Sequence, residues 1–189
     1  MKAHDVDRLF RTLADAQHGL VGRDQVRARG VSRQAVRCRL ASPDWDLFTD
    51  RVLRLVGMPR TPDQRAMAAT LDAGPNSALS HASAAALWPL RGFNLDQLHV
   101  SRTREGTDRP TALAIVHTPM LLPNHHRTHH RGIPVTTLAR TVVDLATTEH
   151  PNRVEVALHA ALRLGLRWKE LVLRITEIPH CRSPKSRRC

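Results

Sequence analysis

Aromatic residues and cysteines are scarce in this chain of 189 residues. Aromatic residues make up 3% of the chain and tyrosine is absent, so the chain has few of the stacking platforms with which proteins bind RNA and single-stranded DNA. The three cysteines, Cys38, Cys181 and Cys189, form no CxxC pair, which argues against both a disulfide framework and a cysteine zinc site. This cysteine usage fits a reducing compartment, and we expect a cytoplasmic protein.

Long apolar runs and enzyme motifs are missing as well. No run reaches the roughly 18 apolar residues of a membrane-spanning helix, and the N-terminal sequence MKAHDVDRLF lacks the apolar segment of a signal peptide. There is no glycine-rich phosphate loop, Walker lysine motif or paired-carboxylate motif. Ser80, His81 and Asp144 are residue types of a hydrolytic triad, but no nucleophile-elbow motif surrounds the serine. We interpret Ser80 as a helix N-cap. We therefore expect no membrane association, no catalytic residue and no cofactor.

Acidic residues are few compared with basic ones. The chain has 17 Asp and Glu against 29 Lys and Arg, a formal net charge of +12 and a pI of about 11.4. Such a surface attracts polyanions, although an arginine-rich composition can also serve solubility alone. Because stacking residues are scarce, duplex DNA is favoured over RNA.

The first 60 residues show the pattern of three helices followed by a hairpin. Apolar residues recur at three- and four-residue spacing over residues 5–17, and shorter helices are predicted over residues 23–28 and 32–40, with Ser32 as N-cap. Apolar pairs then flank Thr49 and Asp50, which predicts a two-stranded wing over residues 47–56. We expect residues 1–60 to form a winged helix-turn-helix.

Basic residues cluster on the last two predicted helices, where residues 23–39 hold six arginines and one aspartate. Helical geometry places Arg33, Gln34 and Arg37 on one arc, from which they can read base edges in the major groove. We expect the remaining DNA contacts to come from phosphate-binding residues and from the wing: Ser32, Arg23, Arg27, Arg29, Arg39, Arg51 and Arg54. The alternative is a protein-interaction module with a solvated arginine face.

A break rich in glycine and proline at residues 57–62 separates this unit from a second one, over residues 61–176. Helices are predicted over residues 63–72, 80–88, 137–147, 154–166 and 168–175, and strands over residues 97–101, 113–117 and 133–135. This order indicates a small mixed α/β domain with C-terminal helices and an α+β chain overall. Residues 177–189 are predicted to be a disordered basic tail.

The second unit contains two weaker candidates for a functional site, a group of four histidines and a set of three residues that could share a pocket. His125, His126, His129 and His130 lie between Pro123 and Gly132 without a nearby carboxylate or cysteine, so we predict a solvent-exposed loop and no metal site. His81, Trp88 and Arg140 could line a shared polar pocket or interface. We favour the alternative in which Trp88 packs in the core and Arg140 forms an ion pair.

Four segments of the chain resemble antitoxins of the AbiEi type, from type IV toxin–antitoxin systems of abortive infection. They are TLADAQHGLVGRDQVRARGVSRQAVRCRL (12–40), RVLRLVG (51–57), LSHASAAALWPL (79–90) and IPVTTLARTVVDLA (133–146). The resemblance implies an N-terminal winged helix that binds promoter DNA and represses its own operon, followed by a domain with antitoxin function. It also implies a nucleotidyltransferase-like toxin that is neutralised without a stable complex.

The chain departs from longer relatives, which continue into an endonuclease-like domain with clustered acidic residues. No such segment follows residue 176, so nuclease activity is not expected. Two alternatives remain beside the antitoxin and repressor: a truncated remnant of a nuclease-fused relative, and a protein-interaction module without specific DNA binding. No dimer interface is recognisable in the sequence, so it predicts no oligomeric state.

Overall fold

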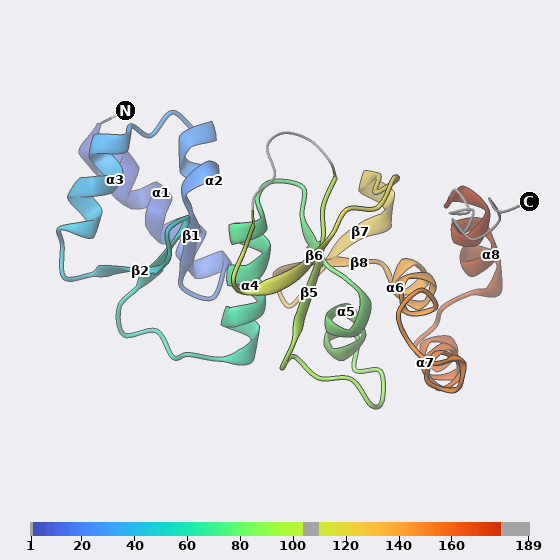
Figure 1. Cartoon of the computed structure of the whole chain (residues 1–189). Coiled ribbons are helices and arrows are strands. Elements are labelled where there is room, and N and C mark those ends of the chain that lie inside the picture. Colours follow the sequence, from blue (N-terminus) through green and yellow to red (C-terminus); the bar gives the residue numbers. More distant parts are fainter. Residues whose placement is uncertain (1, 104–109, 179–189) are drawn as a thin grey trace, which may run out of the picture.

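The computed structural model describes residues 2–103 and 110–178 and has an α+β architecture with two sheets (Figure 1). This confirms the predicted class. Cys181, Cys189 and the predicted tail from residue 179 lie outside the described residues. Within the described part of the chain, no helix combines the length and the apolar character that crossing a membrane requires.

Three helices and a small sheet form the N-terminal end of the molecule. The elements are α1 (Ala3–Ala16), β1 (Leu20–Gly22), α2 (Arg23–Ala28), α3 (Arg33–Leu40), β2 (Trp45–Thr49) and β3 (Val52–Leu55). Both strand pairs of this sheet, ordered β1-β3-β2, are antiparallel. The predicted helical stripe is buried at Val6 and Phe10, while Ala16 at its end is exposed. Phe10 meets the edge of Trp45 at 5.3 Å between ring centroids and packs in one cluster with Val26, Val36 and Leu53.

Helix α4 (Pro62–Ala73) lies between the two sheets (Figure 1). It begins at the N-cap Thr61, whose Oγ1 accepts a hydrogen bond from the Gln64 amide at 3.0 Å, and it is buried along most of its length. Leu20 and Val52 of the first sheet belong to the same core cluster as α4 and the second sheet. The apolar core is therefore continuous across the boundary predicted at residues 57–62.

The second sheet has five strands in the order β6-β5-β4-β8-β7. Its elements are β4 (Ala78–Leu79), α5 (His81–Leu87), β5 (Leu98–Ser101), β6 (Ala114–His117), η1 (Asn124–His126), β7 (Arg127–His130) and β8 (Ile133–Thr136). The pairs β5–β6 and β4–β8 are parallel, while β4–β5 and β7–β8 are antiparallel. Helix α4 covers one face of this sheet, and α5 with α6 (Leu138–Leu145) lies on the other (Figure 1).

Helices α7 (Pro151–Arg163) and α8 (Trp168–Glu177) follow α6 at the C-terminal end. Helix α6 contacts both of them, and its residues Val142 and Leu145 share a core cluster with Ala161 and Leu171. Helix α8 includes Glu177, so the predicted start of a disordered tail at residue 177 is wrong. The prediction failed because Glu177 has partners far away in the sequence, described below.

The predicted exposed loop over the four histidines is also wrong. His125 and His126 lie in η1, and His129 and His130 lie in β7, which pairs with β8 through the turn at Arg131 and Gly132. Both turn residues have positive φ, 52° and 77°, as a tight hairpin turn requires. His126 is fully buried while His125 is exposed. The histidines resemble a polar loop in sequence because β7 has only four residues, RTHH, and none of them is apolar.

Candidate functional site

The predicted recognition helix, α3, presents a basic face to solvent. Ser32 caps its N-terminus, since Oγ accepts a hydrogen bond from the Ala35 amide at 3.1 Å. Val36 is buried in the N-terminal core. This anchors the helix, and Arg33, Gln34 and Arg37 are exposed, as the helical spacing predicts.

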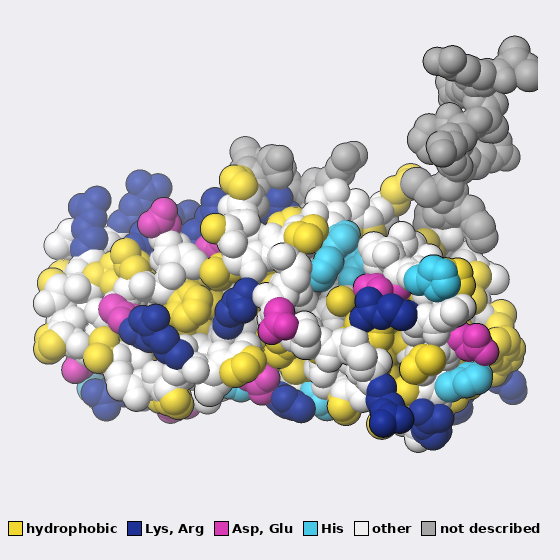
Figure 2. Space-filling view, turned by 60° about the horizontal axis from the view of Figure 1, so that its bottom comes forward, with side chains coloured by type: hydrophobic (Ala, Val, Ile, Leu, Met, Phe, Trp, Pro, Cys, Tyr) yellow, Lys and Arg dark blue, Asp and Glu magenta, His cyan; other side chains and the backbone are white. Residues whose placement is uncertain are grey.

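Helices α2 and α3 together enclose a basic cleft. Its volume is about 280 Å³, and four arginines line it together with Val31 and Val36: Arg23, Arg27, Arg33 and Arg37. We call this feature the arginine cleft. Arg27 Nη1 lies 4.0 Å from Asp24 Oδ1, at the limit of an ion pair. The exposed Arg29 donates a hydrogen bond to the Gln25 carbonyl at 3.0 Å. Figure 2 shows Lys and Arg side chains projecting from the upper edge of this end of the molecule. The fold thus brings residues of two helices into one cationic surface.

Arg39 is not part of that surface, although the sequence predicts a phosphate contact for it. Its Nη2 donates to Asp7 Oδ1 at 2.7 Å and to the Ala3 carbonyl at 3.0 Å, and 13% of its side chain is exposed. The arginine therefore ties α3 to α1. Asp7 is 32 residues away, so helical periodicity gave no signal of this pairing.

The two predicted wing arginines also have partners inside the molecule. Arg54 pairs across the hairpin with Asp46, with Nε to Oδ1 at 3.0 Å, and this hydrogen bond holds the pKa of Asp46 below its usual range. Arg51 donates to the carbonyls of Asp72 at 3.3 Å and Pro110 at 3.2 Å. Thr49 Oγ1 donates to Asp72 Oδ1 at 2.6 Å, so the hairpin tip is attached to the end of α4. The structure therefore does not place Arg51 and Arg54 on a projecting wing.

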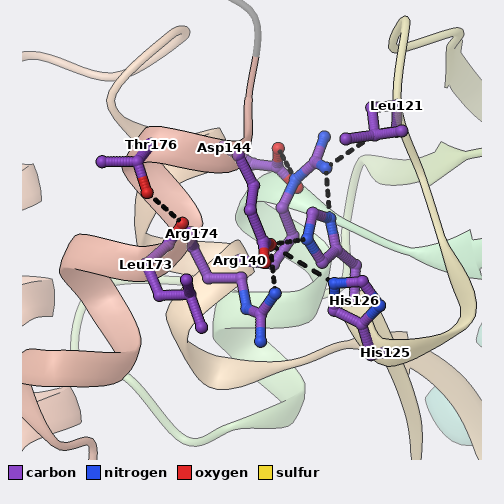
Figure 3. Close-up of polar contacts among 9 residues, drawn as sticks. Leu121, His125, His126, Arg140, Asp144, Leu173, Arg174 and Thr176 are labelled. Carbon is purple, nitrogen blue, oxygen red and sulfur yellow. Dashed lines mark hydrogen bonds and ion pairs between the residues drawn. The ribbon is translucent and has the colours of Figure 1, made fainter.

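A buried polar network lies at the other end of the molecule, between η1, α6 and α8 (Figure 3). Arg140 donates from Nε to Asp144 Oδ1 at 2.7 Å and from Nη1 to the Leu121 carbonyl at 2.9 Å and His126 Nδ1 at 3.0 Å. His126 Nε2 lies 2.8 Å from Glu177 Oε2, which also accepts from Arg174. The ion pair predicted for Arg140 is confirmed, and the network joins α8 to the core.

His125, His126 and Glu177 have the composition of a metal site, and their ligand atoms lie within 4.8 Å of one another. The hydrogen bonds do not fit one. Arg140 can only donate, so His126 Nδ1 must accept, and the ring proton is on Nε2, where it is donated to Glu177. That leaves His126 no free lone pair for a metal. The hydrogen bond from His126 is also the largest cause that lowers the pKa of Glu177, to about 2, with His125 and Arg174 adding to it.

The other predicted group, His81, Trp88 and Arg140, is only partly brought together. His81 and Arg140 line one cavity, which does not include Trp88. Trp88 Nε1 instead donates to the Thr136 carbonyl at 2.9 Å, and its ring packs near His130. Ser80 is the N-cap residue of α5, but its hydroxyl lies 2.9 Å from His81 Nδ1 and makes no capping bond. Asp144 pairs with Arg140 and not with a histidine, so no triad is assembled.

Three histidine rings stack beside this cavity, which the sequence did not indicate because they come from different elements. His81 of α5 lies 3.7 Å from His117 of β6 between centroids, and His99 of β5 lies 5.3 Å from His117. His99 Nδ1 and His117 Nε2 are 3.0 Å apart. Burial lowers the pKa of all three, that of His81 to about 3, with the charges of His117, His99 and Arg140 adding to the effect on His81.

Acidification below pH 6.5 is therefore expected to destabilise the fold. The pKa of His81 is lower in the folded than in the unfolded chain, so its contribution is present above about pH 6.5 and is lost as the pH falls toward 3. At about pH 5, the free energy of unfolding has lost about 2 kcal/mol through His81. Burial raises the pKa of Asp144 to about 6. Protonation of this carboxyl below about pH 6 therefore stabilises the fold, and at about pH 5 it adds about 1 kcal/mol to the free energy of unfolding.

Urea unfolding at about pH 7.5 and pH 5 tests this pH dependence. His81→Asn is the matched variant, since asparagine tolerates the positive φ of 50° at this position. We expect the variant to lose less stability than the wild type between the two pH values. Equal losses in both proteins would contradict the role assigned to His81.

No protein-family model matches this chain, and no curated protein matches it either.

Proposed function

We propose that this chain binds duplex DNA, with α2 and α3 as the helix-turn-helix and the exposed face of α3 in the major groove. The observation that carries the proposal is the arginine cleft, in which two helices contribute four arginines while Val36 holds α3 against the N-terminal core. The major groove admits one α-helix, and arginine and glutamine side chains recognise guanine and adenine there. In this proposal Arg33, Gln34 and Arg37 read bases, and Arg23, Arg27 and Arg29 contact phosphates with Ser32.

The element order supports a winged helix-turn-helix over residues 1–60, because three helices are followed by the hairpin β2–β3. The hairpin tip is attached to α4 through Thr49 and Arg51. In this proposal the wing is therefore a packing element, and α3 supplies the sequence readout.

A regulatory role follows from the family resemblance. We propose an autorepressor and antitoxin of a type IV toxin–antitoxin system, without enzymatic activity and acting in the cytoplasm. Residues 61–176 then provide the antitoxin function toward a nucleotidyltransferase-like toxin, without a stable complex. The support for DNA binding comes from the residues of α2 and α3, whereas the antitoxin role is supported by the resemblance.

A protein-interaction module is the second candidate, and α8 is the observation that favours it. This helix exposes a set of large apolar side chains, Trp168, Val172, Leu173 and Ile175. Exposed apolar surface of this kind marks contact sites in many proteins.

Fluorescence anisotropy with the full chain separates the two candidates. The probes are a duplex from the region upstream of the coding sequence and a scrambled duplex of equal length, each at low and at physiological salt. A repressor prefers the upstream duplex at the higher salt, because nonspecific phosphate contacts weaken steeply with salt. Equal salt-sensitive binding to both duplexes contradicts a sequence-specific repressor, and absence of binding favours the interaction module.

A further inference from the structure

A second cavity, in the C-terminal half of the molecule, has the features of a ligand site. Its volume is about 450 Å³, within the range of small-molecule pockets. It lies between α5, the strands β5 and β6, and α6. Polar and apolar side chains line it, among them His81, Ser101, His117, Met120, Arg140 and Asp144. We call it the histidine cavity, and it is separate from the arginine cleft.

Two residues that line this cavity each have a buried side-chain oxygen without a hydrogen-bond partner among the described residues. The two oxygens are Ser101 Oγ and Asp144 Oδ2. Both side chains are more than nine-tenths buried, with Ser101 0% and Asp144 5% exposed. Buried polar groups in folded proteins are almost always hydrogen-bonded, since leaving one unpaired is costly. A ligand that displaces the lining side chains enough to reach these oxygens would satisfy both of them.

The backbone at the cavity is strained as well. His81 begins α5 with a φ of 50°, in the left-handed region that side chains other than glycine rarely adopt. Strain of this kind concentrates at binding sites, where the surrounding structure holds the residue in place. Here it places the His81 ring against that of His117, and both rings line the cavity.

The charges at the cavity narrow the class of ligand. Among the described residues that line it, Arg140 and Asp144 are the charged ones, and they neutralise each other at 2.7 Å. Burial holds His81 and His117 neutral by lowering the pKa of each ring. No net charge remains to attract a phosphate, a carboxylate or a metal ion. The free carboxylate oxygen of Asp144 calls for a hydrogen-bond donor, while Ser101 can donate or accept.

We infer that the histidine cavity binds an uncharged planar heterocycle of nucleobase size that donates an N–H to Asp144 Oδ2 and pairs with Ser101 Oγ. A heterocycle presents polar groups at its edge and an apolar face to Val116, Met120 and Ile178, which also line the cavity. This site is independent of DNA binding by α2 and α3, so either can fail without the other.

The test is a two-dimensional ¹H–¹⁵N NMR titration of the full chain. The probes are adenosine and cytidine, each compared with an analogue that lacks only the exocyclic amine, purine riboside and zebularine. We expect saturable shifts at the amides around the cavity with a Kd of about 1 mM or lower for at least one of the two nucleosides. The analogue without the amine binds at least about fivefold more weakly, as the loss of one hydrogen bond predicts.

Ser101→Ala is the variant that separates ligand binding from folding. It removes an unpaired buried hydroxyl, so we expect the Tm to rise by about 2 °C while the affinity for the nucleoside falls about fivefold. Ser77→Ala is the matched control, because the Ser77 hydroxyl is satisfied by the Thr70 carbonyl at 2.6 Å. The control lowers the Tm and leaves the affinity unchanged. The proposal is overturned if neither nucleoside binds, if the analogues bind equally well, or if Ser101→Ala binds as tightly as the wild type.

Discussion

Replacing Arg140 by methionine is expected to lower the free energy of unfolding by about 3–5 kcal/mol, because it removes one partner of a buried ion pair. The guanidinium makes three hydrogen bonds, to Asp144, His126 and the Leu121 carbonyl. All of them are lost, and the Asp144 carboxyl is left buried with no cation beside it. Urea unfolding near pH 7.5 measures the change.

Two further variants show whether the effect comes from burial of the pair. Arg167→Met removes an ion pair with Glu170 in which 79% of the arginine side chain is exposed, so its effect on the free energy of unfolding is expected to be much smaller. The double variant Arg140→Met with Asp144→Leu removes both buried charges and is expected to recover much of the lost stability. If Arg140→Met costs no more than Arg167→Met, the network between η1, α6 and α8 does not stabilise the fold.

The sequence predicted best what depends on near neighbours in the chain. Helices over residues 23–28 and 32–40 follow from apolar spacing and from the Ser32 cap, and the structure has them as α2 and α3. The ion pair of Arg140 also falls within one helical turn, with Asp144 four residues away. These features need no knowledge of the tertiary structure, since local geometry alone determines them.

Partners that are distant in the sequence escaped prediction. Arg39 pairs with Asp7 across 32 residues, and His126 pairs with Glu177 across 51 residues. An arginine on a predicted basic face is indistinguishable in sequence from one that holds two helices together. The same holds for His126, whose partner Glu177 lies at the end of α8. The pairing of Arg54 with Asp46 was easier to predict from the sequence, because the two residues face each other across the hairpin once its register is known.

Replacing both Arg33 and Arg37 by alanine is expected to weaken binding to the upstream duplex by about 30-fold, if each arginine contributes about 1 kcal/mol through base contacts. Both side chains are exposed on α3 and line the arginine cleft. The loss should be smaller on the scrambled duplex, because contacts to base edges carry the sequence preference. Fluorescence anisotropy with the two duplexes at physiological salt measures both losses.

Two single variants give the comparison its controls. Arg39→Ala lies on the same helix, but its guanidinium is bound to Asp7, so we expect DNA affinity within about twofold of the wild type. Arg27→Ala removes a cation expected to contact phosphate, and it should weaken binding to both duplexes and flatten the salt dependence by about one unit of slope. Equal losses on the two duplexes for the Arg33 and Arg37 double variant would show that α3 does not read sequence. A loss with Arg39→Ala as large as with the double variant would show that the affinity depends on the packing of α3 against α1 rather than on its exposed face.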